Sequence, residues 1–145
     1  MPRVSASRSY ARSVHEAQTA WCDVSRWPEW VDGLARISSV DQCWPEPGSC
    51  VVWRSGPAGR GQVTERVEDY DRLGGLTVAV EDDAMVGTQR VGFEPAPEGV
   101  RVEVTLDYRI KRRNPLTWLV ERLFVRRPMI ISLTRSLERF EARLG

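Results

Sequence analysis

Glu65 is the residue whose type and surroundings best suit chemistry. It lies between Val63 and Val67 in a segment where polar and apolar residues alternate. A polar side chain on a buried strand face must be hydrogen-bonded internally or used by the protein, so Glu65 is a candidate catalytic base. Burial without a cationic partner would raise its pKa, whereas pairing with Arg54 or Arg66 would lower it.

Two further polar residues share this pattern. Gln89 lies on a face with Val91 and Phe93, and Tyr108 lies on a face with Leu106. We expect all of these faces to line a cavity, where Gln89 and Phe93 would bind a ligand and Tyr108 would polarise a carbonyl. The alternative is a bulge or an edge strand that turns the carboxylate and the amide to water, while the tyrosine only packs.

Trp53 and Arg54 must lie on opposite faces of one strand, and the sequence does not decide which of them points inward. An inward arginine would polarise a carbonyl or bind an enolate or carboxylate, whereas an inward tryptophan would stack on a planar ring. Trp118 and Leu123, which follow Pro115, complete the predicted ligand-binding residues.

Other chemistries lack support in the sequence. There is no metal-ligand cluster, nucleophile elbow or phosphate-binding loop. The three cysteines, Cys22, Cys43 and Cys50, have no paired metal-ligand spacing and are interpreted as reduced residues. His15 is expected to be exposed near the start of a helix, with no partner nearby in sequence. We therefore predict neither a metal nor a cofactor.

The candidate site residues must be positioned by the secondary structure, of which the clearest part is a regularly alternating strand followed by a long helix. Six apolar residues alternate with five polar ones over residues 100–110, as in a half-buried antiparallel strand. After Pro115 the apolar residues recur at spacings near three, four and seven, which indicates one helix stripe: Leu119, Leu123, Ile130, Leu133, Leu137, Phe140 and Leu144. This helix would cover the sheet and enclose a ligand. Pro128 is expected to bend or divide it and to leave residues 116–127 as a lid.

The remaining elements complete an α+β order. A short strand over residues 4–10 precedes a helix that Ser13 and Glu16 can cap reciprocally, and a shorter helix follows at residues 28–31. The expected strands, separated by turn-rich segments, are residues 35–42, 49–55, 61–70, 76–81, 85–94 and 99–110. Short links favour antiparallel pairing with the helices on one side.

The length of 145 residues fits one domain, and the composition is ordinary for a soluble globular protein. No apolar run is long enough for a membrane span, and the first ten residues lack the core of a signal peptide, which favours the cytoplasm. The net charge of +1 hides an asymmetry. Residues 109–145 hold ten basic and three acidic residues, a net charge of about +7. A solvated helix face is the simpler interpretation, and an anion-facing surface is the functional one.

The segment DVSRWPEWV at residues 23–31 resembles the stretch between the first helix and second strand of the START-like (SRPBCC) helix-grip superfamily, especially its polyketide cyclase/dehydrase branch. Less specific matches extend the resemblance over nearly the whole chain: PGS at 47–49, VTE at 63–65, DRL at 71–73, GVRV at 99–102 and NPL at 114–116. The chain departs from the pattern at Gln18, where many relatives have an apolar residue, and at Pro128.

The resemblance implies a single domain over residues 1–145, with a curved seven-stranded antiparallel sheet wrapped round the C-terminal helix and a cavity for an apolar or aromatic small molecule. It does not imply one chemistry, because proteins of one fold can have different functions. Two functions are therefore considered. One is a polyketide cyclase or aromatase, with Glu65, Tyr108 and Arg54 in catalysis and an acyl carrier protein as partner for the basic tail. The other is a non-catalytic carrier or sensor of lipid, quinone or a similar ligand. Nucleic acid is not expected, because the charges at Arg109 and residues 111–113 lack interleaved aromatics.

Overall fold

The computed structural model describes residues 2–57, 59–111, 116, 119 and 124–144. In chain order its elements are β1 (Arg3–Tyr10), α1 (Val14–Cys22), the 3₁₀ helix η1 (Val24–Arg26), α2 (Trp27–Trp30), β2 (Leu34–Val40), β3 (Cys50–Ser55), β4 (Gln62–Asp71), β5 (Gly75–Glu81), β6 (Met85–Ala96), β7 (Gly99–Ile110) and α4 (Arg126–Leu144). Every expected strand is present, with ends that differ by at most two residues from prediction.

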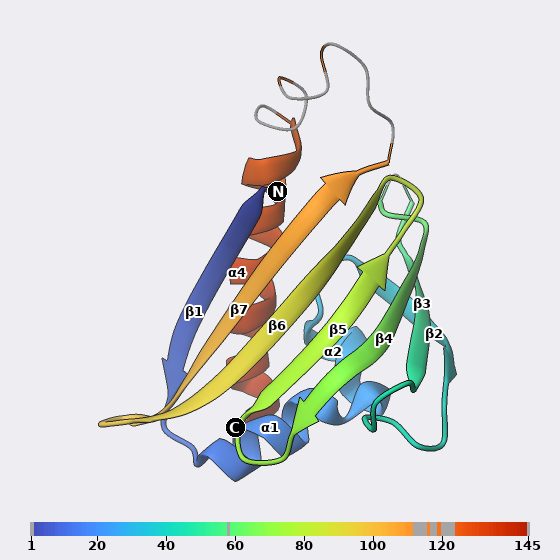
Figure 1. Ribbon diagram of the computed structural model, residues 1–145. Helices are drawn as coiled ribbons and strands as arrows, with labels where there is room; N and C mark the ends of the chain where they lie inside the picture. Colours follow the sequence, from blue (N-terminus) through green and yellow to red (C-terminus); the bar gives the residue numbers. More distant parts are fainter. Residues whose placement is uncertain (1, 58, 112–115, 117–118, 120–123, 145) are drawn as a thin grey trace.

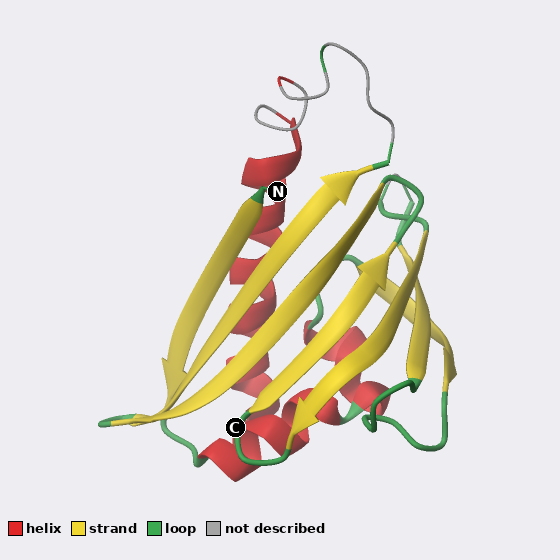
Figure 2. Ribbon diagram, in the orientation of Figure 1, coloured by secondary structure: helices red, strands yellow, loops and turns green. Residues whose placement is uncertain are grey.

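The strands form one antiparallel sheet in the order β1-β7-β6-β5-β4-β3-β2. The sheet curves, and the helices lie together on its concave side (Figures 1 and 2). In β7 the apolar residues from Val100 to Tyr108 are buried, whereas Arg101 and Glu103 are exposed. The alternation in the sequence therefore correctly predicted one face toward the core. The α+β helix-grip fold expected from the resemblance is confirmed.

The first helix begins where the capping residues predicted. The Glu16 backbone amide donates to Ser13 Oγ at 3.0 Å, and the Ser13 amide donates to the Glu16 carboxylate at 3.2 Å. This reciprocal pair satisfies two amides that a helix start leaves free. Pro28 lies in the first turn of α2, where its missing amide proton costs little.

The long helix α4 closes the concave side of the sheet. Leu137 and Phe140 are 2% and 0% exposed, which confirms the core part of the predicted stripe. Tyr10 at the end of β1 donates its hydroxyl to the Leu137 carbonyl at 2.5 Å, and its ring meets Phe140 edge to face at 5.6 Å. The end of β1 is thereby fixed to the second half of α4.

In the described part of the chain α4 starts at Arg126, and the two residues directly before it, Phe124 and Val125, have π-helical backbone. Pro128 therefore lies in the first turn of α4, just after this π-helical pair. The prediction that Pro128 bends or divides a helix that starts earlier concerns residues 120–123, which lie outside the described residues. Half of the lid predicted for residues 116–127, namely residues 117, 118 and 120–123, lies outside the described residues. No helix in the described part of the chain is long and apolar enough to cross a membrane.

Gln18, a polar residue of α1, is buried at 3% exposure. Its amide nitrogen donates to the Asp71 carbonyl at 2.6 Å and lies 3.4 Å from the Gly75 carbonyl. The side chain thus joins α1 to the turn between β4 and β5. The polar residue is tolerated in the core because its donor has acceptors there.

Part of the basic charge on α4 is paired with acids of the body. Arg139 lies 3.1 Å from Asp32, and Arg143 lies 3.2 Å from Asp23. These pairs hold α4 against the segments on either side of α2. They support the simpler interpretation of the charge asymmetry, in which arginines serve the surface and the helix packing.

Candidate functional site

A cavity, which we call the central cavity, lies between α4 and the concave face of the sheet. Its volume is about 70 Å³. The lining residues come from the small helices and the turn after them, from five strands and the turn before β4, and from α4: Trp21, Trp27, Trp30, Val31, Asp32, Trp53, Arg60, Glu65, Val80, Gln89, Val104, Ser132, Leu133 and Ser136. Most of this wall is apolar or aromatic, and a few polar groups converge on it, as in ligand sites.

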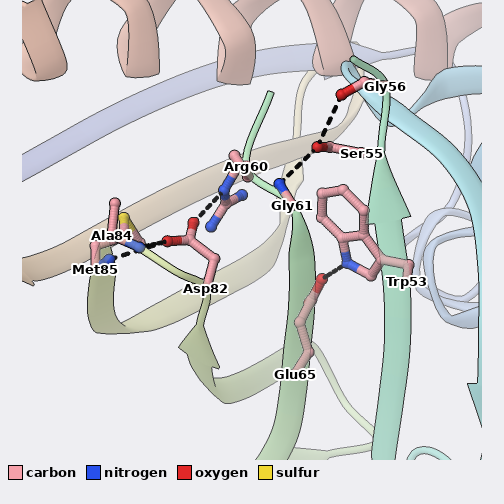
Figure 3. A network of polar contacts seen from close by, with 9 residues as sticks. All are labelled: Trp53, Ser55, Gly56, Arg60, Gly61, Glu65, Asp82, Ala84 and Met85. Atoms are coloured by element: carbon pink, nitrogen blue, oxygen red, sulfur yellow. Dashed lines mark hydrogen bonds and ion pairs between the residues drawn. The ribbon is translucent and has the colours of Figure 1, made fainter. Parts of the chain in front are cut away.

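The sheet contributes a buried polar pair to this cavity. Glu65 on β4 is 9% exposed, and Trp53 on β3 is 2% exposed. The Trp53 Nε1–H donates to Glu65 Oε2 at 2.7 Å (Figure 3). In the antiparallel register Trp53 faces Val63 and Glu65 faces Val51, so the bond runs diagonally between neighbouring inward positions. The alternation of polar and apolar residues around Glu65 predicted this inward position.

Burial raises the pKa of Glu65 above the ordinary carboxyl value. The cause is loss of hydration, which penalises the charged form. The hydrogen bond from Trp53 and the positive charge of Arg60 act in the opposite direction but are smaller effects. Neither Arg54 nor Arg66, the partners considered from the sequence, fills this role, because both are exposed.

Arg60 and Asp82 belong to this site and were not identified from the sequence. Arg60 Nε donates to Asp82 Oδ2 at 2.7 Å, and the Asp82 side chain is 3% exposed. Asp82 Oδ1 also accepts from the amides of Ala84 and Met85. The guanidinium lies between Asp82 and the Trp53 ring, 5.6 Å from the ring centroid (Figure 3). The turn after β5 therefore holds Arg60 in place over Trp53.

Three tryptophans form the aromatic wall. Trp21 and Trp30 have ring centroids 4.6 Å apart, and Trp30 lies 4.8 Å from Phe140. Trp27 donates its indole N–H to the Trp21 carbonyl at 2.7 Å. They wedge the small helices against the core, and they also line the cavity. Packing and cavity lining are therefore combined in the same side chains.

Asp32 joins the turn after α2 to α4 beside the cavity. Ser132 Oγ donates to Asp32 Oδ2 at 2.8 Å, and the Asp32 amide donates to Ser136 Oγ at 2.8 Å. Both serines line the cavity and are half-buried. This group of contacts closes the cavity wall on the helix side.

Of the other predicted site residues, some line the central cavity and some do not. Gln89 lines the cavity as expected. Phe93 and Tyr108 are buried on the concave face but are not among the described residues that line it. Phe93 packs on Trp21 at 6.0 Å, and Tyr108 faces Gly87 across the β6–β7 pair.

Arg54 lies exposed on the outer face, because Trp53 occupies the inward position of β3. The structure therefore removes Arg54 from the candidate catalytic residues. Trp118 and Leu123 fall outside the described residues. His15 is exposed on α1, as expected.

The size of the cavity limits what it holds in this conformation. A cavity of about 150 Å³ accommodates benzene, and ligand pockets span roughly 300–1,000 Å³. The central cavity is smaller than either, at about 70 Å³. In this conformation it has room for the polar end of a ligand, and a whole aromatic ring would require the cavity to widen.

The arrangement nevertheless offers defined chemistry. Glu65 combines an apolar setting, a raised pKa and a fixed hydrogen bond to Trp53. A buried carboxyl whose pKa is raised by desolvation is a candidate acid or base. Among the described residues no cluster of three or more potential ligands could hold a metal ion.

The family model for polyketide cyclase / dehydrase and lipid transport proteins matches residues 1–145. Among solved structures, a protein from Thermus thermophilus has a TM-score of 0.78 at 20% identity, covering 99% of this chain and 97% of its own. A START superfamily protein from Mycobacterium smegmatis has a TM-score of 0.70 at 17% identity, covering 98% and 96%. The di-domain ARO/CYC StfQ of the steffimycin biosynthetic pathway has a TM-score of 0.79 at 17% identity, covering 98% of this chain and 50% of its own. None of the curated proteins matches the chain. At these identities the structures show the shared fold.

Proposed function

The chain belongs to the polyketide cyclase / dehydrase and lipid transport family, and we propose that it binds a small hydrophobic molecule in the central cavity. The apolar part of the molecule would lie against the tryptophan wall and α4. Its polar part would meet Glu65 and Gln89 on the sheet.

One observation carries the proposal: a buried carboxyl, held by Trp53, at the wall of an otherwise largely apolar cavity. A core residue chosen for packing alone would not leave a carboxyl group there, since burying it costs free energy. Ligand sites combine an apolar wall with a few fixed polar groups in the same way.

The test is binding of a neutral environment-sensitive dye, Nile red, and of the planar polyphenol resveratrol. We expect one-to-one binding, reported by dye emission and by quenching of tryptophan fluorescence. The replacement Val104→Leu extends a side chain into the cavity and should weaken binding by about tenfold or more, since a lost 1.4 kcal/mol corresponds to tenfold.

Val102→Leu is the matched control, because Val102 is equally buried on β7 but does not line the described cavity. It should leave binding unchanged while costing about 1–3 kcal/mol of stability through overpacking. Absence of binding by both probes would argue against the proposal, as would equal effects of the two valine replacements.

A second candidate function is proton-transfer catalysis of the cyclase or aromatase type. The observation that favours it over a purely carrying role is the buried Glu65 carboxyl at the cavity wall, where desolvation raises its pKa, because a carrier needs no titratable group there. Confinement of the substrate would supply the rest of the rate enhancement. Glu65→Gln should then abolish turnover of a poly-β-ketone substrate while ligand affinity is kept, since the amide keeps the shape but accepts no proton.

An acyl carrier protein would be the partner if the substrate arrives on a carrier. Residues 109–145 have a net charge of about +7. Lys111, Arg139 and Arg143 are paired with acids of the body, so the remaining basic residues of this segment would attract an acidic partner. Such binding should weaken steeply as salt is raised, because exposed charges are screened.

A further inference from the structure

The solvent side of α4 differs between its two halves. In the second half, Arg139, Glu141 and Arg143 each lie within 3.2 Å of an oppositely charged side chain of the body. In the described part of the chain, the exposed arginines of the first half have no ion-pair partner: Arg126, Arg127 and Arg135. No acidic residue lies in the segment 124–137. The first half of α4 therefore presents uncompensated positive charge to solvent.

Exposed apolar side chains accompany these arginines. Four of the six large apolar residues that are exposed in the described part of the chain lie between positions 116 and 131: Leu116, Leu119, Phe124 and Ile131. Phe124 is 71% exposed and Ile131 is 42% exposed. Exposed apolar residues that are grouped, unlike scattered single ones, mark an interaction surface.

The helix places both kinds of residue on one face. Arg127, Ile131 and Arg135 recur every four residues, and residues at this spacing lie above one another on an α-helix. Phe124 lies about one turn before Arg127, in the π-helical pair that precedes the helix. We call these four residues the outer row of α4. Leu133, on the opposite side of the helix, lines the central cavity.

The composition of the outer row matches a surface of anionic lipids. A helix in the interfacial zone of a bilayer places its arginines at the lipid phosphates and its apolar residues among the upper acyl chains. Each basic residue near an anionic bilayer strengthens binding by about fivefold. An acidic protein would also attract the arginines, but it would need an apolar patch in register with Phe124 and Ile131. A bilayer offers both kinds of contact at every point of its surface.

We propose that the outer row of α4 is a peripheral docking surface for membranes that contain anionic lipids. The same turns of α4 form one wall of the central cavity through Ser132 and Leu133. Docking would therefore place this wall next to the lipid phase, which is a source of apolar molecules. The inference goes beyond the proposed function, because the surface binds lipid whether or not the cavity is occupied.

The test is co-sedimentation of the full chain with vesicles, made either of phosphatidylcholine alone or of equal parts phosphatidylcholine and phosphatidylglycerol. Binding to the vesicles with phosphatidylglycerol should be about tenfold tighter or more, and it should weaken as salt is raised, because exposed charges are screened. No binding to these vesicles, or equal binding to both kinds, would overturn the proposal. Binding of Nile red in the central cavity is measured without vesicles, so the two proposals fail separately.

Two double variants assign the binding to the outer row. Arg127→Gln with Arg135→Gln should weaken binding to the anionic vesicles by about 25-fold, since each basic residue contributes about fivefold. Arg54→Gln with Arg66→Gln is the matched control, because it removes the same charge from exposed positions on the outer face of the sheet. The control should change binding by less than about twofold, since its charges lie on another face. Equal losses in the two double variants would overturn the assignment to α4.

Phe124→Ala separates a lipid surface from a purely electrostatic one. Loss of the ring should weaken binding to the anionic vesicles by about tenfold, because less apolar area enters the bilayer. Leu73→Ala, which shortens an apolar side chain 87% exposed in the turn between β4 and β5, should leave binding unchanged. Binding that responds to the arginine variants but not to Phe124→Ala would overturn the lipid assignment in favour of a soluble acidic partner. All of these side chains are exposed, so the variants should keep the wild-type denaturation midpoint.

Discussion

The burial of Glu65 predicts a specific dependence of stability on pH. A carboxyl whose pKa is raised in the folded state binds its proton more tightly there than in the unfolded chain, so folding is favoured at low pH. As pH rises from the ordinary carboxyl value of 4.5 through the raised folded value, this contribution is lost. Each unit by which the folded pKa exceeds the unfolded one corresponds to about 1.4 kcal/mol.

Glu65→Gln removes the titration and keeps both the shape and an acceptor for the Trp53 indole. Relative to the wild type, the variant should therefore gain stability between pH 4 and pH 8, by about 1.4 kcal/mol for each unit of the shift. Urea denaturation at several pH values, followed by tryptophan fluorescence, measures the difference. Glu68→Gln controls for the loss of one negative charge, because Glu68 is exposed on the same strand.

A difference between wild type and Glu65→Gln that stays constant from pH 4 to pH 8 would refute the reasoning about desolvation. A Glu65→Gln variant that becomes less stable than the wild type as pH rises would show that the pKa of Glu65 is lowered by folding. In that case the charge of Arg60 and the bond from Trp53 would outweigh burial, and Glu65 would be ionised in the native protein.

Three further predictions concern the framework of the site. Leu137→Ala should cost about 2–5 kcal/mol in urea denaturation, because the side chain is 2% exposed; Leu73→Ala, at 87% exposure, should cost less than about 0.5 kcal/mol, and similar costs would place Leu137 outside the core. Ser13→Ala should lower stability by about 1 kcal/mol through loss of the helix cap, and an unchanged denaturation midpoint would mean that the capping bonds contribute nothing. Tyr10→Phe should cost about 1 kcal/mol by removing the hydroxyl bond to α4, and hydrogen exchange of the α4 amides should increase; unaltered exchange would disprove the link between β1 and α4.

Much of the fold was predictable because it follows from local patterns. The alternation over residues 100–110 specifies one buried face, and side chains on a strand have a fixed period of two. Ser13 and Glu16 mark a helix start through bonds only three residues apart. The inward position of Glu65 followed from the same period of two, because this period can be read from one strand without knowing its partner strands.

The start of the terminal helix shows the limit of local reasoning. The apolar stripe predicted one helix from position 119 onward. In the described residues α4 is regular from Arg126, and the two residues before it, Phe124 and Val125, are π-helical. A hydrophobic period reveals which face is buried but does not fix where regular α-helical hydrogen bonding begins.

Tertiary structure alone decided the composition of the site. Which of Trp53 and Arg54 points inward depends on how β3 pairs with β4, and this pairing also brings the indole to Glu65 across 12 positions of sequence. Arg60 and Asp82 lie in turns 22 positions apart, where no periodicity marks a residue as buried. Their ion pair forms because two strand connections meet at one end of the sheet, and contacts of that kind are set by packing rather than by any pattern within a single segment.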